Sequence, residues 1–134
     1  MSQTLPDNER IAREFFAALS AGDYPRLERL FAEDAVWTVV PVSIPGSGDH
    51  KGARAIADDF RGIRSTLFVD GDPKLHVTNS FSGGPWVAVE THTVGRLKNG
   101  ATYDSHYCWI LQIIDGRIST LKEYMDGGYV SQQI

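Results

Sequence analysis

The sequence predicts an α+β domain in which three N-terminal helices lie on one face of a curved antiparallel sheet. In the first half of the chain, apolar residues recur at helical spacing. The second half instead contains long runs that alternate polar and apolar residues and are separated by glycine-containing turns. The chain has 134 residues, 42% of them hydrophobic, which suits one compact domain, and we assign residues 1–134 to it.

Three helices are expected, at about residues 7–22, 25–31 and 53–63. Pro6 and Asp7 suit the start of the first helix, and Gly22 suits its end. Pro25 fits the first turn of the second helix. Residues 41–52 are rich in proline and glycine and therefore predict a loop before the third helix.

Five strands are expected, at about residues 35–40, 74–81, 86–97, 101–113 and 117–125. The last three are joined at 98–100 and 114–116, and both segments end in Asn-Gly or Asp-Gly. We interpret both as three-residue loops whose glycine adopts the left-handed conformation. This register sets Val89 opposite Trp109, whereas a two-residue turn would set Glu90 there, and the apolar pair is the better one.

The predicted register divides the side chains of the last three strands between two faces. One face carries the rows Val89–Trp109–Leu121, Thr91–Tyr107–Glu123 and Thr93–Ser105–Met125. The other carries Glu90–Cys108–Lys122 and His92–His106–Tyr124. The first face is the more apolar and should pack against the helices. Its polar members gather at one end, where we expect a pocket.

Composition excludes several classes of function. The net charge is −4 and no segment concentrates Lys and Arg, so nucleic acid is not an expected partner. No run of about 18 apolar residues is present, so no membrane span is expected. A single cysteine, Cys108, fits a reducing compartment. The segment Met1–Arg10 is polar and lacks a signal-peptide core, and we therefore expect a cytoplasmic protein.

Two stretches of the chain resemble a known superfamily. The segments 16–23 (FAALSAGD) and 30–37 (LFAEDAVW) resemble the opening of nuclear-transport-factor-2-like (NTF2-like) proteins. The ending, DGRI at 115–118 with KEYMD at 122–126, resembles the SnoaL-like and ketosteroid-isomerase-related members. The resemblance implies a cone-shaped fold with a deep pocket and usually a dimer. The superfamily includes isomerases, cyclases, dehydratases, epoxide hydrolases and binders without activity, so the fold alone does not identify the chemistry.

The resemblance excludes two of these chemistries. The positions that match the catalytic tyrosine and two acids of ketosteroid isomerases are Phe15, Val40 and Trp109, all apolar. The Arg-x-Asp pair of limonene-epoxide-hydrolase-like enzymes falls on 91–93, which reads Thr-His-Thr. Only the third acid of that site has a counterpart, Glu123. Both activities are therefore disfavoured.

The phenazine-biosynthesis members give a partial match. Their closing pattern, Arg-Glu-Phe-Met-Asn, is similar to residues 122–126, and their general-acid glutamate falls on Glu123. A pocket tyrosine of that family falls on Tyr103, but its helix-borne histidine falls on Asp59. The match supports an acid–base role for Glu123 and does not carry over the substrate.

Glu123 is the main catalytic candidate. A carboxyl on the apolar face should be desolvated, which raises its pKa and suits general acid–base catalysis. The alternative is a glutamate at the sheet rim that is either solvated or paired with an arginine such as Arg54 or Arg61. Tyr107 and Tyr103 are candidates for binding a carbonyl or hydroxyl oxygen of the substrate, because a phenol both donates and accepts hydrogen bonds.

The pocket wall is expected to bind a small hydrophobic molecule, with no cofactor. Its predicted members are Trp37, Phe16, Phe60, Thr91, Ser105, Trp109, Leu121 and Met125. No metal site is predicted either. His92 and His106 face each other, but two ligands are too few for zinc, and we place them in a dimer interface.

Two functional hypotheses follow. The first is a cofactor-independent acid–base enzyme (isomerase, cyclase, dehydratase or hydratase) acting on a small hydrophobic carbonyl or hydroxyl compound. The second is a ligand-binding or assembly module of the same fold without turnover. In both cases a homodimer is expected through the outer face of the sheet, around Ala88, Cys108, Ile110 and Ile118.

Overall fold

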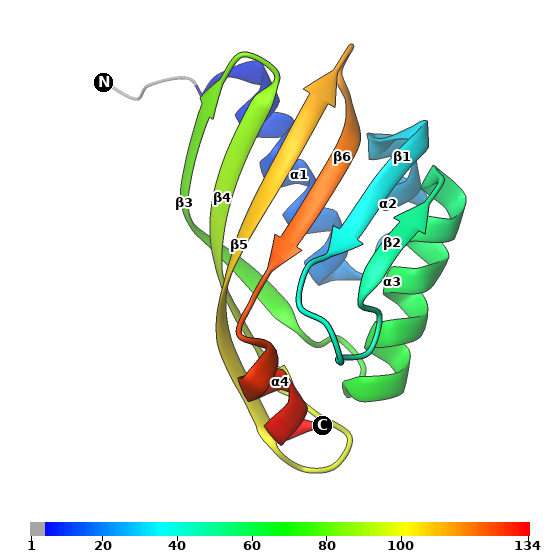
Figure 1. The fold of residues 1–134 in the computed structure, drawn as a ribbon, viewed down its shortest axis with the longest axis vertical. Coiled ribbons are helices and arrows are strands. Elements are labelled where there is room, and N and C mark those ends of the chain that lie inside the picture. Colours follow the sequence, from blue (N-terminus) through cyan, green and yellow to red (C-terminus); the bar gives the residue numbers. More distant parts are fainter. Residues whose placement is uncertain (1–4) are drawn as a thin grey trace.

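The computed structural model describes residues 5–134 (Figure 1). The first four residues, part of the polar start noted above, lie outside the described residues. The elements in chain order are α1 (Asp7–Ala21), α2 (Tyr24–Leu30), β1 (Phe31–Val39), β2 (Gly48–Lys51), α3 (Ala53–Leu67), β3 (Lys74–Gly83), β4 (Trp86–Arg96), β5 (Thr102–Ile114), β6 (Arg117–Tyr124) and α4 (Gly127–Gln133). Within residues 5–134 no helix is long and apolar enough to cross a membrane.

The six strands form one curved, unclosed sheet in the order β2-β1-β6-β5-β4-β3, which confirms the predicted α+β class. Neighbouring strands are antiparallel except β1 and β6, which run parallel. The predicted antiparallel sheet is thus confirmed apart from this one parallel pair. In Figure 1, α1 crosses behind the sheet, while α4 lies at the end where β4 and β5 curl over.

The core lies between α1 and the inner face of the sheet. Phe15 and Phe16 on α1 are almost fully buried, and both rings pack edge-on against Trp109 of β5 at centroid distances of 6.1 and 5.1 Å. The helix ends at Gly22, whose left-handed φ of 68° lets its N–H bond back to Leu19. The sequence pattern therefore positions α1 as the layer behind the sheet.

Several predicted boundaries were wrong. Phe31 does not end the second helix: it adopts an extended conformation and begins β1, four residues before the expected start. The predicted loop at 41–52 contains β2, which pairs with β1. The third helix continues to Leu67 because Arg64 and Leu67 line the interior beyond the predicted end. Helix α4 was not predicted.

The register between β4 and β5 is confirmed. Val89 pairs with Trp109, and His92 pairs with His106, as the three-residue loop at 98–100 requires. Gly100 has a φ of 91°, the left-handed conformation expected of it.

The register between β5 and β6 was wrong by two residues. The connection is a two-residue turn in which Asp115 and Gly116 both have positive φ (52° and 77°), so Ile114 pairs with Arg117. One extra residue in β6, at Ser119, then shifts the register by one further position. The two changes together preserve which face later residues occupy, so Glu123 faces the interior as predicted but lies opposite Trp109 instead of Tyr107.

Ile118 lies between the turn and this extra residue and is therefore on the opposite face from the one predicted. It is 0% exposed and belongs to the core. Ile118 is thus no part of the outer face on which the dimer was expected.

Candidate active-site cavity

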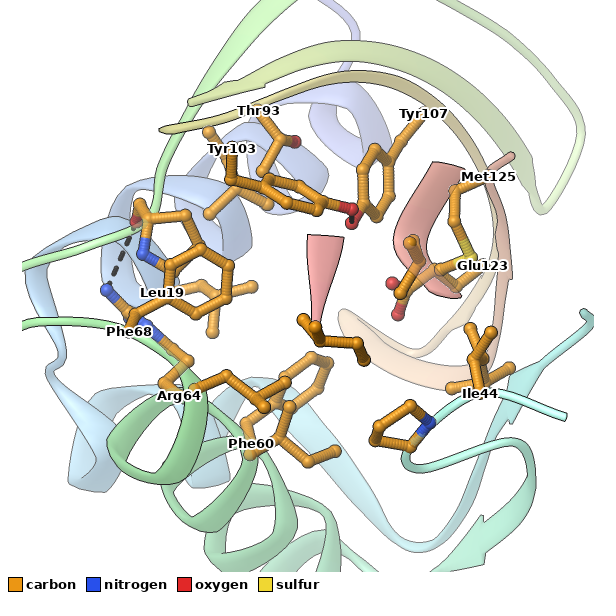
Figure 2. Close-up of a pocket in the computed structure, with 18 of the residues that line it drawn as sticks. Leu19, Ile44, Phe60, Arg64, Phe68, Thr93, Tyr103, Tyr107, Glu123 and Met125 are labelled. Atoms are coloured by element: carbon orange, nitrogen blue, oxygen red, sulfur yellow. Dashed lines mark hydrogen bonds between the residues drawn. The ribbon is translucent and has the colours of Figure 1, made fainter. Parts of the chain in front are cut away.

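A cavity of about 100 Å³ lies between α3, the inner face of the sheet and α4 (Figure 2). Its lining is mostly aromatic and aliphatic. The residues that line it are Leu19, Trp37, Val39, Ile44, Pro45, Phe60, Ile63, Arg64, Leu67, Phe68, Pro73, Leu75, Thr93, Tyr103, Tyr107, Trp109, Glu123, Met125, Val130 and Ile134.

Glu123 supplies the one side-chain carboxyl group in this lining among residues 5–134. It is 7% exposed, and its Oε1 accepts a hydrogen bond from Trp37 Nε1 at 3.0 Å. Burial raises the pKa of Glu123 from its ordinary 4.5 to about 8, because a dry cavity disfavours the charged form, and the Trp37 bond offsets part of this rise. Glu123 is therefore mostly protonated at pH 7.

The predicted alternative, a carboxylate paired with an arginine, was wrong. No ion pair to Glu123 is found within residues 5–134. Arg61 instead lies over the Tyr24 ring, 5.0 Å from its centroid, and Arg54 is exposed at the start of α3. A carboxyl that is neither ion-paired nor exposed is free to exchange its proton with a bound molecule.

Trp37, the hydrogen-bond donor to Glu123, is fixed by two stacked rings. Phe60 lies against one side of the indole at 3.7 Å between centroids, and His50 stacks on it at 4.3 Å. His50 is itself oriented by Asp59 Oδ2, 2.7 Å from its Nδ1, and by the Gly46 carbonyl, 2.6 Å from its Nε2. Asp59 therefore supports the position of Trp37 from outside the cavity.

Tyr103 and Tyr107 point their hydroxyl groups toward each other over the same hollow that the Glu123 carboxyl faces (Figure 2). The two oxygens are 2.5 Å apart and share a hydrogen bond. Burial raises the pKa of Tyr103 to about 12 and raises that of Tyr107 well above its ordinary value. Both phenols are therefore neutral at pH 7, and one hydroxyl proton remains free for a ligand oxygen.

Seven of the predicted site residues line the cavity together. They are Trp37, Phe60, Tyr103, Tyr107, Trp109, Glu123 and Met125. Strand alternation places the sheet residues of this set on the inner face, and Phe60 reaches the same cavity from α3.

Four predicted wall residues do not line it. Phe16 packs behind Trp109, and the Thr91 hydroxyl accepts the Trp109 Nε1 hydrogen bond at 3.0 Å on the core side. Leu121 is fully buried opposite Leu111, because the register shift moves it away from the cavity end. Ser105 is buried on the same face but is not among the lining residues.

Two parts of the wall come from segments that strand alternation does not describe. Ile44 and Pro45 belong to the loop after β1, and Val130 and Ile134 belong to the C-terminal segment. The i, i+4 spacing of the last two, after the capping residue Asp126, is a sequence signal for α4.

Arg64 is the charged residue of the wall that the sequence analysis did not predict. Its guanidinium is buried and donates to the backbone carbonyls of Ser20, Asp72 and Pro73, at 3.2–3.4 Å. These bonds hold the end of α1 and the start of β3 against α3. In Figure 2 its guanidinium lies at the cavity edge, away from Glu123.

The cavity is poorly suited to a metal ion. Its described lining offers the Glu123 carboxyl but no imidazole and no thiolate. Protein metal sites usually combine three or more such ligands. Its chemistry is therefore that of one acid and two phenols in a mostly apolar wall, with the Thr93 hydroxyl and the Arg64 guanidinium as further polar groups.

Comparison with known proteins agrees with this geometry. Residues 12–121 match the SnoaL-like domain family. Among solved structures, the protein Bal32a from a soil-derived mobile gene cassette has 25% sequence identity and a TM-score of 0.82, covering 93% of each chain.

Two further structures share the fold at lower identity. An NTF2-like protein of unknown function from Burkholderia pseudomallei has 17% identity and a TM-score of 0.86, covering 97% of this chain and 98% of that one. A protein with a ketosteroid-isomerase-like fold from Catenulispora acidiphila, solved in complex with trimethylamine, has 18% identity and a TM-score of 0.82. The match covers 97% of this chain and 93% of that one.

Proposed function

Since this chain belongs to the SnoaL-like domain family, which includes cofactor-independent isomerases and cyclases, we propose that it is a cofactor-independent acid–base enzyme. Its substrate would be a small hydrophobic carbonyl or hydroxyl compound. The observation that carries the proposal is the buried, unpaired carboxyl of Glu123 in an aromatic cavity, with a pKa of about 8. Perturbed acids of this kind are concentrated at catalytic sites.

The acid and the two phenols each have a role in this proposal. Protonated Glu123 donates its proton to the substrate and recovers it as the reaction completes. The free hydroxyl proton of the Tyr103–Tyr107 pair binds the substrate oxygen and stabilises negative charge that develops on it. Trp109, Phe60 and Met125 exclude water from the proton transfer. Isomerisation, cyclisation, dehydration and hydration all use this set of groups.

The cavity volume limits the substrate. About 100 Å³ is less than the roughly 150 Å³ of an apolar cavity known to bind benzene. We therefore expect compounds smaller than benzene, with fewer than about six non-hydrogen atoms and one carbonyl or hydroxyl group. A panel of such compounds tests the proposal: binding is followed by thermal shift and conversion by proton NMR. The proposal fails if none of the compounds is converted.

A second candidate function, binding without turnover, is favoured by the setting of Glu123 among Trp37, Phe60, Tyr103, Tyr107 and Trp109. Aromatic rings and a carboxylate together suit a small ammonium ion. The fold relative in complex with trimethylamine is consistent with such a ligand.

Tetramethylammonium tests the cation-binding candidate separately from the enzyme proposal. The charge of this ion does not depend on pH, so any effect of pH on its binding comes from the protein. If the cavity holds a small cation, titration calorimetry is expected to show at least tenfold tighter binding at pH 9 than at pH 6, since Glu123 must ionise. Absence of binding at both pH values would exclude the cation-binding candidate and leave the enzyme proposal in place.

We also propose a homodimer through the outer face of the sheet. Trp86 and Tyr124 are 42% and 40% exposed there, and Ala88, Cys108 and Ile110 are partly buried beside them. Sedimentation at micromolar concentration is expected to give a dimer. Ile110→Asp, at the centre of this face, is expected to give a folded monomer because it places a charge in the interface. A monomeric wild-type protein would contradict the proposal.

A further inference from the structure

A cluster of three potential metal ligands lies on the outer face of the sheet, away from the cavity. Asp104 and His106 are two residues apart on β5, so their side chains leave the same face. His92 on β4 lies directly opposite His106 in the confirmed register. The two hairpin strands therefore bring two imidazoles and one carboxylate together.

The ligand atoms of these three residues are already close. One nitrogen or oxygen from each of His92, Asp104 and His106 lies within 4.8 Å of the others. His92 Nε2 is 2.6 Å from Asp104 Oδ1, and the two imidazole rings stack at 4.5 Å between centroids. All three side chains are at least partly exposed in the monomer, two rows of the sheet away from the Ala88–Ile110 pair at the centre of the proposed dimer face.

We propose that His92, Asp104 and His106 bind one divalent transition-metal ion on the outer face of the sheet. Two imidazoles and a carboxylate are ligands that Zn²⁺ accepts, at about 2.0–2.2 Å each. Tetrahedral geometry around zinc needs ligand atoms about 3.4 Å apart, so His92 Nε2 and Asp104 Oδ1 must separate by about 0.8 Å. Small rotamer changes of the His92 and Asp104 side chains are sufficient for this separation.

The site leaves the fourth position of a tetrahedral ion open to water. Its three ligands come from β4 and β5, whose backbones are joined by a continuous ladder, so they are held on a rigid platform. Cu²⁺ is expected to bind more tightly than Zn²⁺, following the general order for nitrogen and oxygen ligands. The site does not depend on the proposed catalytic function, because Glu123 faces the other side of the sheet.

The two histidines alone were too few ligands for a metal site. Asp104 was overlooked because it stands two residues before His106, and only the combination of strand alternation with the cross-strand pair shows the three together. His76 on β3 lies opposite His92 in the same row, but its ring is not part of the cluster within 4.8 Å. It provides a matched control.

Titration calorimetry of metal-free protein with ZnCl₂ tests the proposal. Wild type is expected to bind one Zn²⁺ per chain. His106→Ala and Asp104→Asn are each expected to weaken binding at least tenfold, the usual effect of losing one of three ligands. His76→Ala is expected to stay within about twofold of wild type. Circular dichroism of each variant without metal verifies that the fold is kept.

Two results would overturn the proposal. One is a wild-type protein that binds no Zn²⁺, or that binds it without a ratio of one ion per chain. The other is a His76→Ala protein that loses as much affinity as His106→Ala, which would indicate general adsorption to surface imidazoles. Proton NMR of the imidazole ring protons provides a second measurement: one equivalent of Zn²⁺ is expected to shift His92 and His106 but not His50.

Discussion

Glu123→Gln is expected to remove a pH dependence of stability that the wild-type protein shows between about pH 4.5 and pH 8. In the folded protein the pKa of Glu123 is raised from 4.5 to about 8, so the folded state holds this proton more tightly than the unfolded state. The stability that this proton provides is complete below pH 4.5 and is lost as the pH rises through 8. The unfolding free energy of wild type should therefore fall over this window.

The expected size of this loss is roughly 3–5 kcal/mol, at about 1.4 kcal/mol for each pKa unit. Glutamine keeps the shape of the side chain, and its carbonyl oxygen still accepts the Trp37 hydrogen bond. Urea unfolding should show the variant and wild type to be equally stable at pH 4.5, and the variant more stable by this amount at pH 9.

The exposed Glu28 on α2 supplies the matched control, since Glu28→Gln makes the same chemical change in water. That variant should follow the wild-type stability curve at every pH. If Glu123→Gln is instead less stable than wild type at all pH values, the carboxylate contributes a structural interaction, and the account of Glu123 as a desolvated acid is wrong.

Turnover is expected to fall by about 10²–10⁴-fold in Glu123→Gln, the usual contribution of general acid–base catalysis. The amide cannot donate a proton of comparable acidity, while the wall that binds the substrate is unchanged. The measurement is kcat and KM for a compound converted in the substrate panel. We expect kcat to fall and KM to change little, because the lost interaction acts in the transition state.

Wild-type turnover should also decline as the pH rises through 8, because the proton donor is then lost. Tyr107→Phe should reduce kcat less, since Tyr103 keeps one hydroxyl at the site. A Glu123→Gln protein that retains activity within a few fold of wild type would exclude Glu123 as the proton donor, even if its stability profile is as predicted.

The part of the site that sequence predicted correctly came from strand alternation. Period-two patterning placed Tyr103 and Tyr107 on the inner face, because the turn at 98–100 has the geometry that its glycine suggests. Glu123 kept its predicted face only because the tighter turn and the extra residue in β6 offset each other. The register of β6 was wrong, since Asp115-Gly116 formed a tighter turn and Ser119 added a residue. The alternation of polar and apolar residues does not show whether the connection between β5 and β6 is a two-residue or a three-residue turn.

The rest of the cavity depends on tertiary contacts between distant segments. Arg64 lies in the last turn of α3, and its partners are carbonyls of α1 and of the segment before β3, which no local pattern connects. Ile44 and Val130 reach the cavity from a loop and a C-terminal helix. The positions of Ile44 and Val130 depend on the curvature of the sheet, and that curvature is determined by the whole fold.

The most direct test of the account is the titration of Glu123 itself. The side-chain carboxyl carbon, labelled with ¹³C in all glutamates, is followed by NMR from pH 4 to pH 10 and assigned by comparison with Glu123→Gln. The account predicts that the one signal missing from the variant titrates with a pKa of about 8. A signal that titrates near 4.5 would show an ordinary ionised carboxylate at neutral pH and would contradict the role of Glu123 as a proton donor.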